Sequence, residues 1–207
     1  MGRPREFDQD KVLDAASRVF WANGYEATST RALSEATSLT PASIYNAFGD
    51  KRGLFLSAME HYLNSTIRNR IARHEALPSA SAALTGFFTE SMDRALSDPD
   101  QRGCMLVNTA LESTPRNPEL TEFVAAEMRQ IEAFFLRVIK TGQKNGEFPK
   151  DIKPEDLAAQ FLTLLMGMRV LSRVRPEAKL FNSLIRPAFA QLGLVWPNRT
   201  RKISPTL

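Results

Sequence analysis

Helical periodicity along nearly the whole chain constrains the fold more than any other feature of this 207-residue sequence. Apolar residues, mostly Leu and Ala, recur every three to four positions, as they do along the buried face of an α-helix. Alternating Val, Ile and Thr runs, which would indicate strands, are absent from the sequence. The pattern therefore predicts an all-α protein. The expected helices cover residues 9–23, 29–36, 41–47, 51–75, 80–97, 103–113, 118–144, 154–174 and 177–193, with a kink or break at Pro187.

Composition excludes several classes of protein. The sequence has one cysteine, Cys104, so no disulfide can form within the chain, and a reducing cytoplasm is the expected compartment. The two histidines lie far from that cysteine, so we expect no zinc site of the usual Cys/His kind and no other metal or cofactor. Charges interrupt the apolar runs and the first residues lack an apolar core, so we expect neither a membrane span nor a secretory signal. The net charge of +4 permits nucleic-acid binding without proving it.

The segment 20–55 contains two short helical patterns joined by a tight turn, after a longer helix. Hydroxyl residues begin both: Thr28 or Ser29 caps the first helix, and Thr40 caps the second, with Pro41 at its first position. Helix N-termini of this kind present backbone N–H groups that attract phosphate. Small residues at the start of the second helix would let it enter the major groove of DNA. We interpret this segment as a helix-turn-helix.

The same segment resembles the N-terminal domain of the TetR/AcrR family of bacterial transcriptional regulators. The family pattern has an aromatic residue, Gly-Tyr, two hydroxyl residues, Ile/Leu-Tyr-x-x-Phe, a lysine and Leu-Phe. In this sequence those positions are Phe20, Gly24, Tyr25, Thr28, Ser29, Ile44, Tyr45, Phe48, Lys51, Leu54 and Phe55. The turn departs from the family's usual Ala-Gly-Val, because Ser38 stands where glycine usually tolerates a positive φ.

The resemblance implies a DNA-binding domain at residues 1–50, a connecting helix at 51–75, and a ligand-binding and dimerisation domain at 76–207. Tyr45 and Lys51 are expected at phosphates, with ring packing and simple solvation as their respective alternatives. The expected DNA-binding residues are Thr28, Ser29, Arg31, Thr40, Pro41, Ala42, Ser43, Tyr45, Asn46 and Lys51.

Within the larger domain, the resemblance implies an apolar inducer pocket with a few polar groups. Arg169 is unusual inside an apolar helix, and forms either a buried ion pair or an anchor for an acidic ligand. Cys104 is either a redox-sensitive thiol or a plainly buried residue among apolar neighbours. The candidate pocket residues are Phe88, Met92, Cys104, Asn108, Glu112, Phe135, Met166 and Arg169.

Two apolar stripes on the last two long helices exceed what one core needs, which predicts a homodimer. The candidate interface residues are Phe161, Leu164, Leu165, Met168, Phe189 and Leu192.

These features predict a transcriptional repressor that binds a pseudo-palindromic operator in double-stranded DNA as a homodimer. A small-molecule inducer would release it from the DNA. The alternative is a helical small-molecule-binding protein or enzyme with an incidental helix-turn-helix. We expect no enzymatic activity, because the sequence has no Gly-rich phosphate loop, no recognisable catalytic triad and no cluster of metal ligands.

Overall fold

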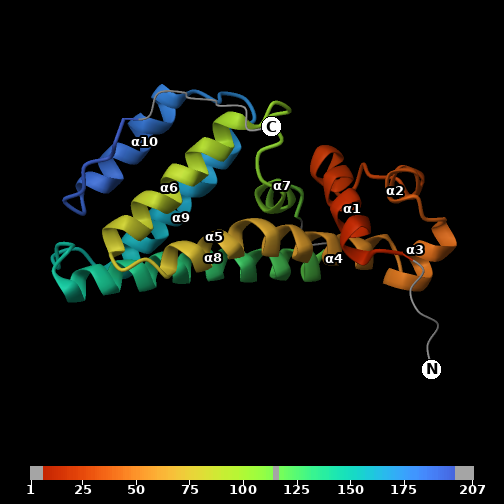
Figure 1. Cartoon of the computed structure of the whole chain (residues 1–207), viewed down its shortest axis with the longest axis horizontal. Helices are drawn as coiled ribbons and strands as arrows, with labels where there is room; N and C mark the ends of the chain where they lie inside the picture. The colour runs from red at the N-terminus through yellow and green to blue at the C-terminus, as the bar shows by residue number, and fades with distance from the viewer. Residues whose placement is uncertain (1–6, 114–116, 199–207) are drawn as a thin grey trace. The chain divides into compact units, whose positions relative to one another are not determined.

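The computed structural model describes residues 7–113 and 117–198. Every regular element within these residues is a helix, as the periodicity predicts (Figure 1). The helices are α1 (Gln9–Asn23), α2 (Thr30–Thr37), α3 (Pro41–Phe48), α4 (Lys51–Leu63), η1 (Asn64–Arg68), α5 (Asn69–Glu75), α6 (Ala80–Ser97), α7 (Met105–Glu112), α8 (Pro118–Asn145), α9 (Pro154–Leu171) and α10 (Ala178–Ala190). None of the described helices is long and apolar enough to cross a membrane.

Side-chain caps fix where the N-terminal helices begin. Asp8, Asp50 and the predicted cap Thr40 each accept a hydrogen bond from a backbone N–H in the first turn of α1, α4 and α3, respectively. Of the two hydroxyl residues that could cap α2, Ser29 does so. Because a cap satisfies N–H groups that have no partner within the helix, these starting points are encoded locally.

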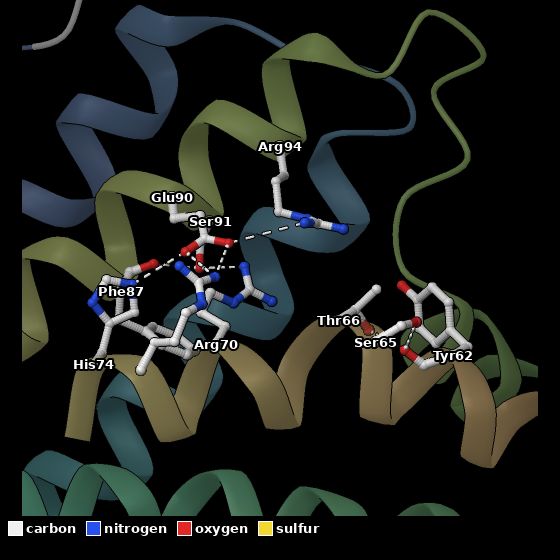
Figure 2. Close-up of polar contacts among 10 residues, drawn as sticks. Tyr62, Ser65, Thr66, Arg70, His74, Phe87, Glu90, Ser91 and Arg94 are labelled. Atoms are coloured by element: carbon white, nitrogen blue, oxygen red, sulfur yellow. Dashed lines mark hydrogen bonds and ion pairs between the residues drawn. The ribbon is translucent and has the colours of Figure 1, made fainter. Parts of the chain in front are cut away.

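A π-helical turn, η1, lies between α4 and α5, where the periodicity predicts one continuous helix at 51–75. The hydroxyls of Ser65 and Thr66 both donate to the carbonyl of Tyr62, at 3.1 and 2.5 Å (Figure 2). Side-chain hydroxyls that bind a helix carbonyl compete with the regular backbone hydrogen bonds. Two side-chain hydroxyls therefore meet at one backbone carbonyl close to the start of the π-helical turn.

The helical bounds differ from the expected ones mainly at C-terminal ends. α9 ends at Leu171, three residues before the expected end, and α10 ends at Ala190 rather than near residue 193. Pro187 lies inside α10 and does not divide it. Helix ends carry weaker local signals than capped starts, so differences of this size are ordinary.

The described chain divides into two compact units. The head unit consists of the residues up to Asn69 together with Cys104–Ser113, and the body unit consists of Arg70–Gly103 and the residues from Asn117 onward. Thus α7, which the sequence places within the larger domain, packs against α1 and α4 in the head unit. Only the tertiary contacts show that α7 belongs to the head unit, because no signal within residues 103–113 indicates which core the helix joins.

The core of the body unit is built from aromatic rings on α6, α8, α9 and α10. Neighbouring ring centroids lie 5.0 Å apart for Phe87–Phe134, 5.5 Å for Phe88–Phe161 and 5.7 Å for Phe161–Phe189. Burying one such side chain contributes about 1.5–3 kcal/mol, so this cluster dominates the packing of the unit. Its phenylalanine members, all fully buried, are Phe87, Phe88, Phe134, Phe135, Phe161 and Phe189.

Candidate nucleic-acid interface

The three N-terminal helices are held together by a small apolar core. Phe20 of α1, Leu33 of α2 and Ile44 of α3 are each no more than 2% exposed. Phe20 also makes an edge contact with the ring of Phe55 in α4, with centroids 4.9 Å apart. Each short helix therefore contributes one buried apolar side chain to this core.

The turn between α2 and α3 places Ser38 in a left-handed backbone conformation. Ser38 has φ 57 and ψ 22, the left-handed region that the family's glycine tolerates more easily. The hydroxyl of Thr37 donates to the carbonyl of Leu33 at 2.7 Å, closing the end of α2. Serine therefore occupies this turn in a left-handed backbone conformation, which is unfavourable in free energy for a residue with a side chain.

One face of α3 is open to solvent and carries most of the expected DNA-binding residues. Tyr45 is 47% exposed, and Pro41, Ala42 and Asn46 are exposed. Thr40 accepts the N–H of Ser43 at 3.1 Å. Small side chains at the start of the helix, followed by an exposed phenol and amide, give a surface that can approach base edges and phosphates.

The expected DNA-binding residues at and before the start of α2 are divided between exposed and buried positions. Ser29 and Arg31 are exposed, and Arg31 pairs with Glu35 at 2.8 Å on the helix surface. Thr28 is 2% exposed, and its hydroxyl donates to the carbonyl of Gly24 at 2.6 Å. The structure therefore gives Thr28 an internal role in the turn before α2, where a phosphate contact through its hydroxyl was expected.

Lys51, at the start of α4, is oriented by two contacts. Its Nζ atom lies 4.7 Å from the centroid of the Tyr25 ring, and it donates to the carbonyl of Glu26 at 3.3 Å. The Tyr25 ring packs in turn on Phe55, with centroids 4.9 Å apart. Lys51 is thus held near the α1–α2 turn instead of moving freely in solvent.

Glu112 reaches the same turn from the end of α7. Its Oε2 atom accepts the backbone N–H of Tyr25 at 2.9 Å. Glu112 is one of the expected inducer-pocket residues, but its carboxylate binds a backbone N–H of the head unit. The two residues are 87 positions apart, and no local pattern signals their contact.

Comparisons with known proteins agree with this geometry. Residues 12–58 match the family model described as bacterial regulatory proteins, tetR family, and residues 80–186 match the tetracyclin repressor-like C-terminal domain. The chain is 38% identical over 152 residues to the uncharacterized HTH-type transcriptional regulator YezE of Bacillus subtilis, covering 71% of this chain and 78% of that protein. The chain belongs to the TetR family.

Two further relatives match nearly all of the chain. The HTH-type transcriptional repressor ComR of Escherichia coli is 29% identical and covers 95% of this chain and 92% of its own length. A cysteine mutant of the TetR family transcriptional regulator CifR, solved in complex with a 26-bp double-strand operator DNA, has a TM-score of 0.81 and 36% identity. That match covers 95% of this chain and 100% of CifR. The TetR-family assignment therefore extends over both units.

The inducer-pocket candidates are divided between the two units of this TetR-family chain. Phe88, Met92 and Phe135 are fully buried in the body unit, and Arg169 is 7% exposed there. Met166 is half-buried in the same unit. The remaining candidates, Cys104, Asn108 and Glu112, belong to the head unit.

The thiol of Cys104 is half-buried, which fits neither of its two expected environments fully. The phenol of Tyr62 donates to its Sγ atom at 3.7 Å. Cys104 stands at the N-cap position of α7 without making a side-chain cap hydrogen bond.

The interface candidates on α9 and α10 are mostly buried within their own subunit. Leu164 is half-buried, whereas the others are at most 2% exposed, so they belong to the body core. The buried ones are Phe161, Leu165, Met168, Phe189 and Leu192. The apolar stripes were read correctly as buried faces, but the side chains that cover them come from the same chain.

The body unit contains a buried polar cluster that no sequence pattern predicted. Arg70 is 4% exposed, donates to Ser91 Oγ at 3.1 Å and lies over the ring of Phe87 (Figure 2). Beside it, Glu90 accepts from His74 Nε2 at 3.2 Å. Desolvation raises the pKa of Glu90, but hydrogen bonding to His74 and the neighbouring arginine charges outweigh it, so the pKa is lowered. These residues lie on two different helices, so no spacing within either helix predicts their pairing.

Proposed function

We propose that this TetR-family regulator is a repressor that binds a pseudo-palindromic operator as a homodimer and is released by a small-molecule inducer. The observation that carries the DNA-binding part is the open face of α3, with a capped N-terminus, small first residues and exposed Tyr45 and Asn46. CifR, the 36% identical relative, was solved on operator DNA. Such a regulator acts in the compartment that holds the DNA, which we take to be the cytoplasm.

Selection of duplexes from a random pool tests this proposal directly. We expect enrichment of a pseudo-palindrome whose half-sites lie about one helical turn or slightly more apart, as two linked recognition helices require. Affinity for the enriched duplex should fall steeply with NaCl concentration, because binding releases counterions from the phosphates. A selected pool that contains no shared sequence motif, together with weak binding to every duplex, would overturn the proposal.

For the dimer, we propose the outward side of α9 as the contact with a second copy. Met166 and Gly167 are half-buried and Val170 is exposed, at positions that share one face of α9. A Cβ added at Gly167 would meet nothing within 4 Å, so this face is open for close helix packing. This face replaces the side chains expected from the sequence, which the body core already uses.

For the inducer, we propose binding in the body unit, with Arg169 as the anchor for an acidic group. Arg169 is 7% exposed on a helix whose other buried residues are apolar, and a buried guanidinium is stabilised by an anion. A thermal-shift screen of aliphatic and aromatic carboxylates, with Arg169→Met as the control variant, tests this role. Stabilisation of wild type and variant alike by the same carboxylates would overturn it.

Release also requires a thermodynamic relation that can be measured. An inducer that weakens operator binding a hundredfold must prefer the DNA-free form by about 2.7 kcal/mol. By reciprocity, the operator must weaken inducer binding by the same factor. Equal affinity for a carboxylate with and without operator DNA would mean that the carboxylate is not the inducer.

A further inference from the structure

Glu112 packs closely against the turn between α1 and α2. Glu112 Oε2 accepts the Tyr25 N–H at 2.9 Å, and a Cβ at Gly24 would stand only 2.2 Å from Oε1. Gly24 has φ 80, so both its conformation and the neighbouring carboxylate disfavour a side chain there. A backbone N–H bound to a carboxylate is a charge-assisted hydrogen bond, stronger than one between neutral groups.

The residues fixed by this contact are those that hold Lys51. Tyr25 supplies the ring over which Lys51 Nζ lies, and Glu26, the next residue, supplies the carbonyl to which Nζ donates. Glu112, Tyr25 and Lys51 thus form one connected set within the head unit. Figure 1 shows α7, which carries Glu112, beside α1, and the two helices are in contact.

We propose that Glu112 is a positioning residue for DNA binding, which fixes the Gly24–Glu26 turn and through it holds Lys51 ready for a phosphate. The proposal rests on the proposed function, because it assumes that Lys51 binds DNA. Holding a long, flexible side chain in its bound arrangement reduces the entropy that is lost when the complex forms.

The charge of Glu112 makes the expected effect easy to separate from simple electrostatics. Replacing Glu112 by alanine raises the net charge above its present +4, which by itself strengthens attraction to DNA. The proposal requires the opposite result, a loss of affinity. Asp151, an exposed acidic residue between α8 and α9, provides a charge-matched control in Asp151→Ala.

The experiment compares six full-length proteins on the selected operator over a range of NaCl concentrations. They are wild type, Glu112→Ala, Glu112→Gln, the control Asp151→Ala, Lys51→Ala and the double variant that combines Glu112→Ala with Lys51→Ala. We expect Glu112→Ala to weaken operator binding about three- to tenfold. The slope of log affinity against log NaCl concentration should become shallower by the amount that about one phosphate contact contributes. Lys51→Ala should do the same, and the double variant should bind no more weakly than Lys51→Ala alone. Glu112→Gln, which keeps an acceptor oxygen, should restore most of the affinity.

Three outcomes would overturn the proposal. They are unchanged affinity in Glu112→Ala, effects of the two substitutions that add, or a loss of affinity with an unchanged salt slope and a lowered melting temperature. A measurement on the protein without DNA provides an independent test of the contact. The Tyr25 amide should change its NMR shift and exchange faster in Glu112→Ala, and an unchanged Tyr25 amide would also contradict the contact. If wild type itself shows no salt-dependent duplex binding, the proposed function fails, and this result is distinct from the others.

Discussion

At Tyr45, an exposed phenol on α3 stands where a contact with the DNA backbone is expected. Tyr45→Phe removes one hydroxyl, and we expect operator affinity to fall about fivefold, close to 1 kcal/mol, which is typical of one hydrogen bond. The preferred sequence should not change, because phosphates position the protein without reading bases. Competition among related duplexes measures both properties, and Asn46→Ala is the contrasting variant, since a lost adenine contact relaxes the preference. A changed preference in Tyr45→Phe would contradict the phosphate assignment.

At Ser38, the backbone adopts φ 57, a conformation that serine tolerates poorly. Ser38→Gly should raise the free energy of unfolding by about 0.5 kcal/mol, because relief of the left-handed strain exceeds the entropy that glycine adds to the unfolded chain. Ser38→Val should lower it by at least about 1 kcal/mol, since a β-branched residue is a steric outlier in this region. Urea denaturation monitored by circular dichroism measures both differences. Equal stability of the three proteins would mean that the turn relaxes around its residue.

At the scale of single elements, the start of α6 shows how a distant carboxylate completes a helix. Glu147 accepts from the hydroxyls of Ser79 and Ser81 at 2.7 and 2.8 Å, and from the N–H groups of Ala80 and Ser81. These hydrogen bonds, led by that from the Ser79 hydroxyl, hold the pKa of Glu147 at about 2, below its ordinary 4.5. The carboxylate therefore stabilises α6 in the same way as a capping residue.

This depressed pKa has a definite sign in the pH dependence of folding. The stabilisation is complete above the unfolded pKa near 4.5 and is lost as the pH falls towards 2. Glu147→Gln should therefore lower the free energy of unfolding by about 1–2 kcal/mol at pH 7, with the difference from wild type shrinking between pH 4.5 and 2. Urea denaturation across this range tests it, with Asp151→Asn as the control. A difference that stayed constant over the whole range would assign the effect to packing.

At the scale of the whole molecule, the proposed dimer depends on the outward face of α9. Val170→Glu should raise the dimer dissociation constant at least tenfold, because it places a charge in an apolar contact. It should also reduce operator affinity, since two linked heads bind two half-sites. Sedimentation velocity over a range of concentrations measures the dimer. The control is Leu77→Glu, which changes a partly exposed apolar residue before α6. A Val170→Glu protein that stays dimeric would place the interface elsewhere.

Leu165→Glu distinguishes a residue of the body core from a residue of the dimer interface. Leu165 is 2% exposed within its own unit, so a charge there should unfold the body unit and not merely separate two subunits. A folded monomer of Leu165→Glu, seen by sedimentation and circular dichroism together, would contradict this reading of the core.

The sequence by itself determined the all-helical class, the starting points of the capped helices and the helix-turn-helix. Each of these depends on interactions within about four residues, such as the hydrogen bond between Thr40 and the N–H of Ser43. Hydrophobic periodicity likewise indicated which helical faces are buried, because burial of a face requires a repeat near 3.6 residues.

The tertiary structure decided what covers each face and which distant groups meet. Periodicity marks Leu165 and Phe189 as buried, but it is the same whether the covering residues come from this chain or from a second copy. In the same way, no sequence pattern near Glu112 or Glu147 predicts which backbone N–H groups their carboxylates bind. These groups lie 87 and 67 positions away in the sequence, respectively. Such pairings follow from how packed helices are placed in space, and this placement is set by the summed packing of the whole core, which no local pattern contains.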